Sequence, residues 1–277
     1  MSKKEQKSFN EELDKLFDQW INEIEKNIAN SDKEDQYREG GTGKVIFTRD
    51  GLLEKNDPSI DVYQDWVNAS RRILFILKDQ PTKWCDDVRL WLKDLDTDTQ
   101  ENRDKKKKNR ALGKKFIRNI ANIFYGLANA TAEDDCAFEQ LTYDDVALCF
   151  NTRPFGILET KKQGGGTTLG NTKLNRCLYT YESFIVRQLE IMQPNICVST
   201  SWIITSFLKK QAGSVVSFPG HRGMFYVKAS KTLYLTSYHP SVPANIKDAE
   251  KFYDRVMKDF CVFLREYATE FLGQEEA

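Results

Sequence analysis

The chain has 277 residues, of which 30% are charged, and its 41 basic and 41 acidic side chains leave no net charge at neutral pH. This composition is typical of a globular protein with a sizeable core. It excludes a protein that selects its partners through a strongly basic or acidic overall charge. A nucleic-acid-binding protein of this composition must carry its positive charge on a local face.

Several classes of site and location are disfavoured by what the sequence lacks. It begins with polar residues and has no apolar stretch of about 18 residues, so we expect neither a secretion signal nor a membrane span. The six cysteines are scattered without a C-x-x-C pair, which predicts free thiols and a cytoplasmic location. With only two histidines, we expect no metal and no other cofactor. We assume a monomer.

The first part of the chain predicts a helix and a polar loop. Apolar residues recur at spacings of three and four from Phe9 to Ile28, as in an amphipathic helix. A polar, glycine-containing segment follows at 31–43, and Lys44–Thr48 is predicted as a short strand. We therefore expect residues 1–60 to form an N-terminal helical extension, and residues 61–277 to form an α/β core within one domain, 1–277.

The first buried strand is predicted at Arg72–Leu77, after a short helix at Val62–Ala69. Its continuous apolar run suits a strand that is buried on both faces, as in a parallel sheet. The run ends in Lys78-Asp79-Gln80-Pro81, which places charged and amide groups at a carboxyl end of the sheet. The alternative is a polar loop in which Asp79 makes a salt bridge.

A highly charged stretch follows a predicted helix at Val88–Leu95. Residues Asp96–Arg110 contain four consecutive lysines, Lys105–Lys108, and show no apolar periodicity, so we predict a solvated loop. Lys114, Lys115 and Arg118 extend this charge into the next predicted helix. The charge either lies in solvent or faces the phosphates of a nucleic acid.

A second buried strand is predicted at Asp145–Phe150, and it delivers Asn151 to Phe155 at its end. The loop beyond it contains Lys161, Lys162 and three consecutive glycines. Glycines allow backbone amides to approach a phosphate closely, which makes the loop a candidate phosphate contact. A flexible linker is the alternative.

The rest of the chain continues the alternation of helices and strands. The predicted elements are a helix at Leu178–Met192, a strand at Asn195–Thr200, a helix at Trp202–Lys210, strands at Phe225–Val227 and Leu233–Leu235, and a closing helix at Ile246–Phe271. The alternation predicts a three-layer α/β/α sandwich with a central, mainly parallel sheet of four to five strands.

Polar residues follow three of these strands. Asp79, Asn151 and His239 each come after an apolar run, and His239 is followed by Pro240 and Ser241, which end the strand. Parallel strands present their carboxyl ends on one edge of a sheet. We therefore expect the three side chains to lie around one cavity, although a lone histidine in such a turn is more often only a cap.

The polar residues at these strand ends, in this order, resemble the motifs of the uracil-DNA glycosylase superfamily. The chain looks like a divergent, bacterial-type member of that family. In that family a first strand ends in G-x-[DN]-P or G-E-A-P, a middle strand in asparagine and a last strand in H-P-S. The resemblance spans about Arg71 to Phe260. Lys78 stands at the family's glycine and Gln80 at the carboxylate or asparagine of many members. Asp79 then aligns with the G-E-A-P glutamate, or with the family's aspartate if the loop slips by one residue.

The resemblance implies a DNA glycosylase that removes uracil or a related deaminated or damaged base. It assigns catalysis to Asp79, with Gln80 if the register slips, and to His239 as a donor to the base. Asn151 would pair with the base edge. The other expected substrate contacts are Lys78, Pro81, Ser241, and Lys161 and Lys162 at the phosphates. Phe155, Trp84 or Tyr238 is the candidate to stack on the base, although each of them alone is more typical of a core residue.

Two other functions stay open. Because Gln80 is a poor substitute for a carboxylate, the chain can also be a catalytically inactive nucleic-acid- or nucleotide-binding protein with the same fold. The weaker third reading is a hydrolase for a different glycosidic or phosphoester bond. A serine esterase is disfavoured because the sequence lacks G-x-S-x-G.

Overall fold

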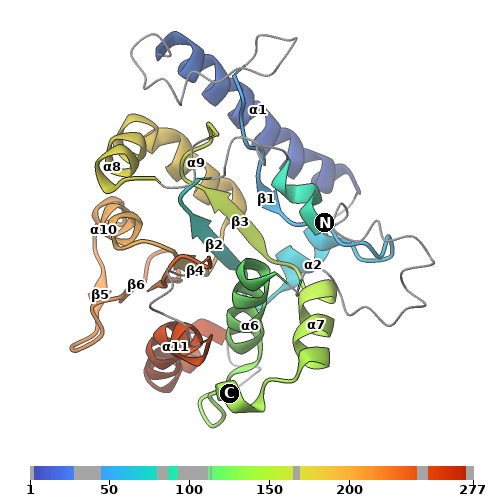
Figure 1. Ribbon diagram of the computed structural model, residues 1–277, viewed down its shortest axis with the longest axis vertical. Coiled ribbons are helices and arrows are strands. Elements are labelled where there is room, and N and C mark those ends of the chain that lie inside the picture. The colour runs from blue at the N-terminus through green and yellow to red at the C-terminus, as the bar shows by residue number, and fades with distance from the viewer. Residues whose placement is uncertain are drawn as a thin grey trace.

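The computed structural model describes residues 3–27, 45–79, 87–92, 112, 114–164, 169–241 and 249–272 (Figure 1). The helices are α1 Lys3–Asn27, α2 Val62–Asn68, α6 Lys115–Asn129, α7 Tyr143–Thr152, α8 Asn171–Thr180, α9 Glu182–Met192, α10 Trp202–Gln211 and α11 Ala249–Leu272, with 3-10 turns at Val88–Leu90 and Phe138–Gln140. The strands are β1 Gly51–Leu52, β2 Ile73–Leu77, β3 Gly156–Glu159, β4 Ile196–Ser199, β5 Val216–Ser217, β6 Met224–Val227 and β7 Thr232–Thr236.

All seven strands form one mixed sheet in the order β1-β3-β2-β4-β7-β6-β5. The four central strands, β3, β2, β4 and β7, are parallel, whereas β1 and the β6–β5 end pair in antiparallel fashion. The fold is therefore α/β, as predicted. The narrower prediction of a four- to five-stranded, mainly parallel sheet is not confirmed.

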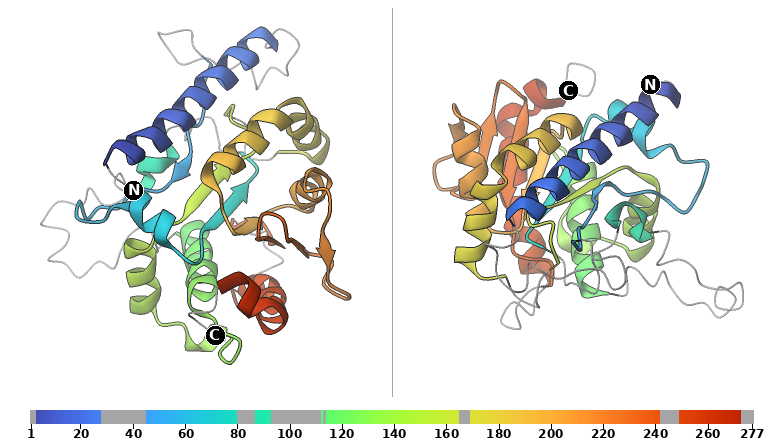
Figure 2. Two further views of the ribbon diagram at one scale, coloured as in Figure 1. Left: turned by 180° about the vertical axis from the view of Figure 1, so that it is seen from behind. Right: turned by 90° about the horizontal axis from the view of Figure 1, so that it is seen from above.

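Helices cover both faces of the sheet (Figure 2). Ile73, Phe75 and Leu77 of β2 belong to one buried cluster together with residues of α6, α7 and α11. Leu74 and Ile76 belong to a second cluster with residues of α1, α8, α9 and α10. Alternate residues of β2 thus face opposite cores, which explains why its sequence is apolar without a break.

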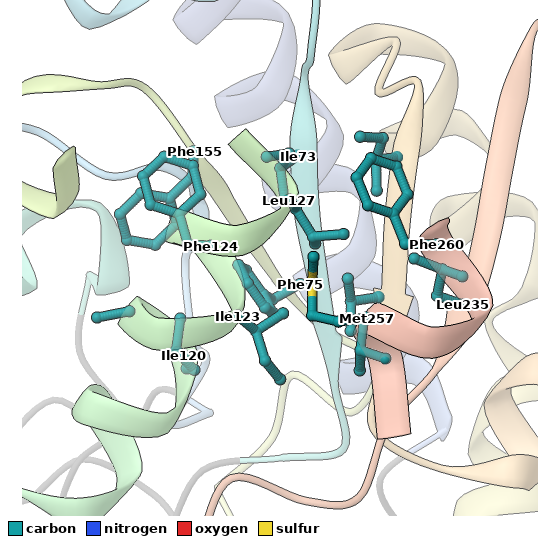
Figure 3. Packing of buried hydrophobic residues seen from close by; sticks show 14 of the residues in the cluster. Ile73, Phe75, Ile120, Ile123, Phe124, Leu127, Phe155, Leu235, Met257 and Phe260 are labelled. Atoms are coloured by element: carbon teal, nitrogen blue, oxygen red, sulfur yellow. The ribbon is translucent and has the colours of Figure 1, made fainter. Parts of the chain in front are cut away.

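The core on the α6 face includes Phe155, which was predicted to stack on a base (Figure 3). Its ring is fully buried, and its centroid lies 4.8 Å from that of Phe124, 5.0 Å from that of Phe150 and 6.2 Å from that of Phe75. No part of the ring is available to a ligand. The stacking role predicted for Phe155 is therefore wrong.

Helix α1 is packed into the second core. Its apolar stripe is buried and includes Leu13, Phe17, Trp20 and Ile24, and the Trp20 ring stacks on Phe184 of α9 at 5.2 Å between centroids. Strand β1 extends the sheet beside β3. The segment predicted as an N-terminal extension therefore supplies one flank of the core.

The predicted strand at Asp145–Phe150 is wrong, because this segment belongs to helix α7. Its buried residues are Val146, Cys149 and Phe150, at the three- and four-residue spacing of a helix. Thr142 also caps the helix by accepting a hydrogen bond from the backbone N–H of Asp145 at 3.2 Å. The strand that pairs with β2 at this point of the chain is instead β3, which begins after Pro154.

Candidate functional site

The carboxyl edge of the central strands is where the topology predicts a ligand site. From β2 the chain adds β3 on one side, and it then adds β4 and β7 on the other side. In open α/β sheets a crevice lies outside the carboxyl ends of the strands at such a reversal. The segments that follow β2, β4 and β7 therefore form the candidate site.

Three contacts hold the His239-Pro240-Ser241 turn at this edge. Asn119 Nδ2 on α6 donates a hydrogen bond to the carbonyl oxygen of Pro240 at 2.8 Å, and the Phe116 ring on the same helix lies 5.9 Å from the imidazole between centroids. The backbone N–H of Ser241 donates to His239 Nδ1 at 3.3 Å. Because Nδ1 accepts this bond, the ring proton lies on Nε2, which is left as a donor.

The surroundings of His239 keep its imidazole neutral. Burial, together with the nearby positive charge of Lys78, lowers the pKa of His239 to about 4. At neutral pH the ring therefore donates a hydrogen bond without carrying a charge. Such a donor can stabilise an oxygen on which negative charge develops, and the ammonium of Lys78 adds positive charge to the same region.

The end of β2 is held by backbone contacts to β3. Thr160 Oγ1 donates to the carbonyl oxygens of Leu77 and Lys78 at 2.9 and 3.0 Å, and the backbone N–H of Lys161 donates to the Lys78 carbonyl at 2.8 Å. These bonds continue the pairing one residue beyond the strand. They fix the backbone from which Asp79, a partly exposed residue, projects.

Alternation along the strands places Asp79 and His239 on the same face of the sheet. Asp79 continues the set of β2 residues that pack against the α6 core, and His239 continues the corresponding set of β7 and contacts α6 directly. One strand, β4, lies between β2 and β7, so the two strands are about 10 Å apart. Gln80 and Pro81, the other predicted residues of the first motif, lie outside the described residues.

A buried hydroxyl lies on the same face. The backbone N–H of Ser237 donates to the Ser199 carbonyl at 2.8 Å, which continues the pairing of β7 with β4. The Ser237 side chain is 5% exposed, and its Oγ has no hydrogen-bond partner within the described part of the chain. A buried hydroxyl without a partner costs about 1–3 kcal/mol, so a polar ligand atom at this position would be stabilising.

Helix α6 brings positive charge to this edge. Its first turn contacts the turn that contains His239, and Lys114, Lys115 and Arg118 are exposed there without an acidic residue in that turn. Cationic side chains at the positive end of a helix favour a bound anion such as a phosphate. The predicted lysine run Lys105–Lys108 and Trp84 lie outside the described residues.

Asn151 lies at the amino ends of the parallel strands, opposite to the carboxyl edge. It belongs to the last turn of α7, whose next residue, Arg153, donates to the Ala128 carbonyl at the end of α6 at 3.2 Å. The neighbouring carbonyl, of Leu127, accepts a bond from Arg71 just before β2 begins. Asn151 is therefore separated from Asp79 and His239 by the length of the strands, and the prediction that all three surround one cavity is wrong.

The two lysines predicted to contact phosphates are buried. Lys161 Nζ donates to the carbonyls of Gln163 and Gly164 at 2.7 and 3.2 Å. Lys162 Nζ forms an ion pair with the fully buried Asp50, beneath aromatic rings of α1 that lie 5.2 Å from the ammonium. Burial lowers the pKa of Lys162, and Asp50 opposes that shift. The predicted phosphate contacts of both lysines are therefore wrong.

Three further residues at this edge are not singled out by the sequence. Phe116 and Asn119 lie in the predicted helix that contains Lys114, Lys115 and Arg118, and Ser237 lies just beyond the predicted strand Leu233–Leu235. The contacts that bring them together span 121 or more positions of the chain, and no local pattern encodes such contacts. For Asn119 the signal was a polar residue within the buried stripe of α6.

The chain matches no protein-family model and no curated protein sequence. Within the part of the chain that the structure describes, no helix combines the length and the apolar character needed to cross a bilayer. The five cysteines in that part are all free thiols.

Proposed function

We propose that this protein binds DNA at the carboxyl edge of β2, β4 and β7 and removes uracil or a related deaminated or damaged base by hydrolysing its N-glycosidic bond. The observation that carries the proposal is the grouping of Asp79, the neutral donor His239 and the buried Ser237 hydroxyl on one face. The exposed basic start of α6 lies beside them and supplies the positive charge that a phosphate backbone requires.

Each group has a role that fits the charges formed in the reaction. Hydrolysis builds negative charge on the leaving base and positive charge on the sugar. His239 Nε2 donates to a base oxygen as negative charge develops there. Asp79 orients the attacking water or stabilises the cationic sugar, as carboxylates do in glycoside hydrolysis. Lys115 and Arg118 hold a phosphate of the strand that carries the base.

The proposal retains two of the three strand ends that resemble the uracil-DNA glycosylase superfamily. Asn151 is excluded from the site. The strand observed in place of the predicted one is β3, which ends at Glu159 and is followed by Thr160. Glu159 is buried, and Thr160 bonds to the carbonyls of Leu77 and Lys78. Neither side chain carries an amide that could pair with a base. Recognition of the base in this site therefore falls to His239 and Ser237.

The four central strands also support an α/β core of this type, since they are parallel and carry the proposed site at their carboxyl edge. We further infer a cytoplasmic location. The free thiols of the described cysteines support it, because cysteines remain reduced in that compartment.

A second candidate is a nucleic-acid-binding protein that does not cleave. The position of Asn151 favours it, because Glu159 and Thr160, the residues at the described end of β3, carry no amide to replace that of Asn151. In this case the edge still binds a strand through α6 and His239, but the bound base stays attached to its sugar.

Base release from defined oligonucleotides separates the two candidates. The protein is incubated with single- and double-stranded oligonucleotides that contain uracil, hypoxanthine or xanthine, and abasic sites are cleaved with alkali. We expect strand breaks at one of the modified positions, and far slower formation of these breaks with His239→Ala. Tight binding without breaks at any of the three bases would favour the non-cleaving candidate.

A further inference from the structure

Two exposed aromatic side chains flank the proposed site at the ends of β4 and β7. Trp202 is 53% exposed and is the first residue of α10, and Tyr238 is 43% exposed and directly precedes His239. Among the residues that the structure describes, neither ring contacts another ring or a cation. Tyr179, a comparably exposed aromatic residue, instead packs against Phe207 and lies beneath Lys210.

A hydrogen bond joins α10 and β7, the elements that precede or carry the two rings, close to both of them. Thr205 Oγ1 on α10 and Thr236 Oγ1 on β7 are 2.7 Å apart. Trp202 precedes Thr205 by one helical turn, about 4.5 Å along the axis, and Tyr238 follows Thr236 by two strand positions, about 6.6 Å. Relative to this bond, both residues are displaced towards the carboxyl edge. Tyr238 continues the α10 face of β7, opposite to the face of Ser237 and His239, so the two sets of residues meet only at the carboxyl edge.

The surroundings of this aromatic pair, Trp202 and Tyr238, suit a nucleobase better than an apolar partner. Ser201 precedes Trp202, and Ser237 and His239 flank Tyr238, so the described neighbours of the rings in the chain are polar except Ile203, which packs against the second core. The first turn of α10 contains no acidic residue, and the exposed basic residues of α6 lie across the same edge. A membrane or a protein partner would require a larger apolar patch.

We propose that the aromatic pair stacks on an unpaired base next to the base held at His239, so that the preferred substrate is a single strand. This inference rests on the proposed function, because it assumes that a nucleic acid occupies the carboxyl edge. Stacking on Trp or Tyr accepts every base, since each base has a π face, and a base within a duplex is not free to stack in this way.

Binding to three fluorescent ligands of equal length tests the proposal. They are single-stranded oligo-dT, the same sugar-phosphate chain with abasic residues throughout, and a duplex. We expect the full-length protein to bind oligo-dT most tightly. Trp202→Ala and Tyr238→Ala should each weaken binding of oligo-dT by roughly tenfold or more, the effect expected from one lost stacking contact, and should leave binding of the abasic chain unchanged.

Control variants separate stacking from misfolding and from charge. Tyr179→Ala should bind all three ligands as the wild type does, and Trp202→Phe should retain most of the affinity for oligo-dT. The salt dependence should be the same in every variant, because no ion pair is removed. Equal loss for oligo-dT and the abasic chain, or no loss for either, would overturn the inference. The inference would also be overturned if the wild type bound anionic vesicles through Trp202 and Tyr238 but did not bind oligonucleotides.

The outcome is separable from that of the proposed function. A protein that binds oligo-dT through the aromatic pair but releases no base keeps the inference and refutes the glycosylase. A protein that releases base with the same KM in the wild type and in both alanine variants keeps the glycosylase and refutes the inference.

Discussion

Lys55 is expected to make the protein more stable at alkaline than at neutral pH. Its side chain is 3% exposed, and its Nζ donates to the carbonyl oxygen of Phe150 in the last turn of α7 at 2.8 Å. Four positions further along the chain lies Pro154, which has no N–H to offer this carbonyl. The side-chain nitrogen of Lys55 therefore replaces the missing backbone donor, and it can donate this bond both as an ammonium and as a neutral amine.

The size of the effect follows from the pKa of Lys55. Burial lowers this pKa from 10.5 to about 7. Between these values the unfolded state binds more protons than the folded state, so the free energy of unfolding rises with pH. At about 1.4 kcal/mol for each unit, Lys55 alone should add about 2 kcal/mol between about pH 7 and pH 9.

Urea unfolding followed by circular dichroism at several pH values measures this contribution. Relative to Lys55→Met, the wild type should gain about 2 kcal/mol between about pH 7 and pH 9. The pH slope is the readout, because the variant also loses the hydrogen bond to Phe150. Lys258→Met is the control, since Lys258 is 76% exposed, and it should keep the wild-type slope. Equal slopes for the wild type and Lys55→Met would refute the reasoning.

Three further variants test other parts of the structure. Asp50→Asn leaves Lys162 buried without its counter-charge and should cost about 3–5 kcal/mol in urea unfolding, whereas a loss below about 1 kcal/mol would contradict a buried pair. In Gly126→Ala the new Cβ would clash with the hydroxyl oxygen of Tyr253 on α11, so the free energy of unfolding should fall by about 1–3 kcal/mol despite better helix propensity; a more stable variant would argue against this packing. Lys78→Met should raise the pKa of His239 from about 4 in an NMR titration, and an unchanged value would remove Lys78 from the site.

Strands β2 and β7 could be predicted from the sequence because their patterns are local. Each is a β-branched or aromatic run that is ended by charged residues or proline, and the ends of both carry polar residues of the candidate site. The segment before Pro154 is a helix and not the predicted strand, because the spacing of its apolar residues matters more than their number. The spacing of Val146, Cys149 and Phe150 indicates a helix, and a helix here places Asn151 before the next strand and therefore away from the carboxyl edge.

The environments of Lys161, Lys162 and Lys55 depend on tertiary contacts that no local pattern encodes. Lys162 is buried because Asp50, 112 positions earlier, meets it beneath α1. A lysine beside three glycines has the local sequence of a surface loop, and only packing shows otherwise. Phe155 illustrates the same limit, because an aromatic residue that follows a polar segment can belong either to a site or to the core.

The central claim is that His239 and Asp79 form the site and that Asn151 does not belong to it. The most direct test is the single-turnover rate of base release from the best oligonucleotide substrate, measured for His239→Ala, Asp79→Asn and Asn151→Ala. We expect His239→Ala to lose about a hundred- to a thousandfold in rate, the effect of removing one oxyanion donor. Asp79→Asn should also be strongly impaired, and Asn151→Ala should react as the wild type does. A slow Asn151→Ala variant together with a normal His239→Ala variant would contradict the account.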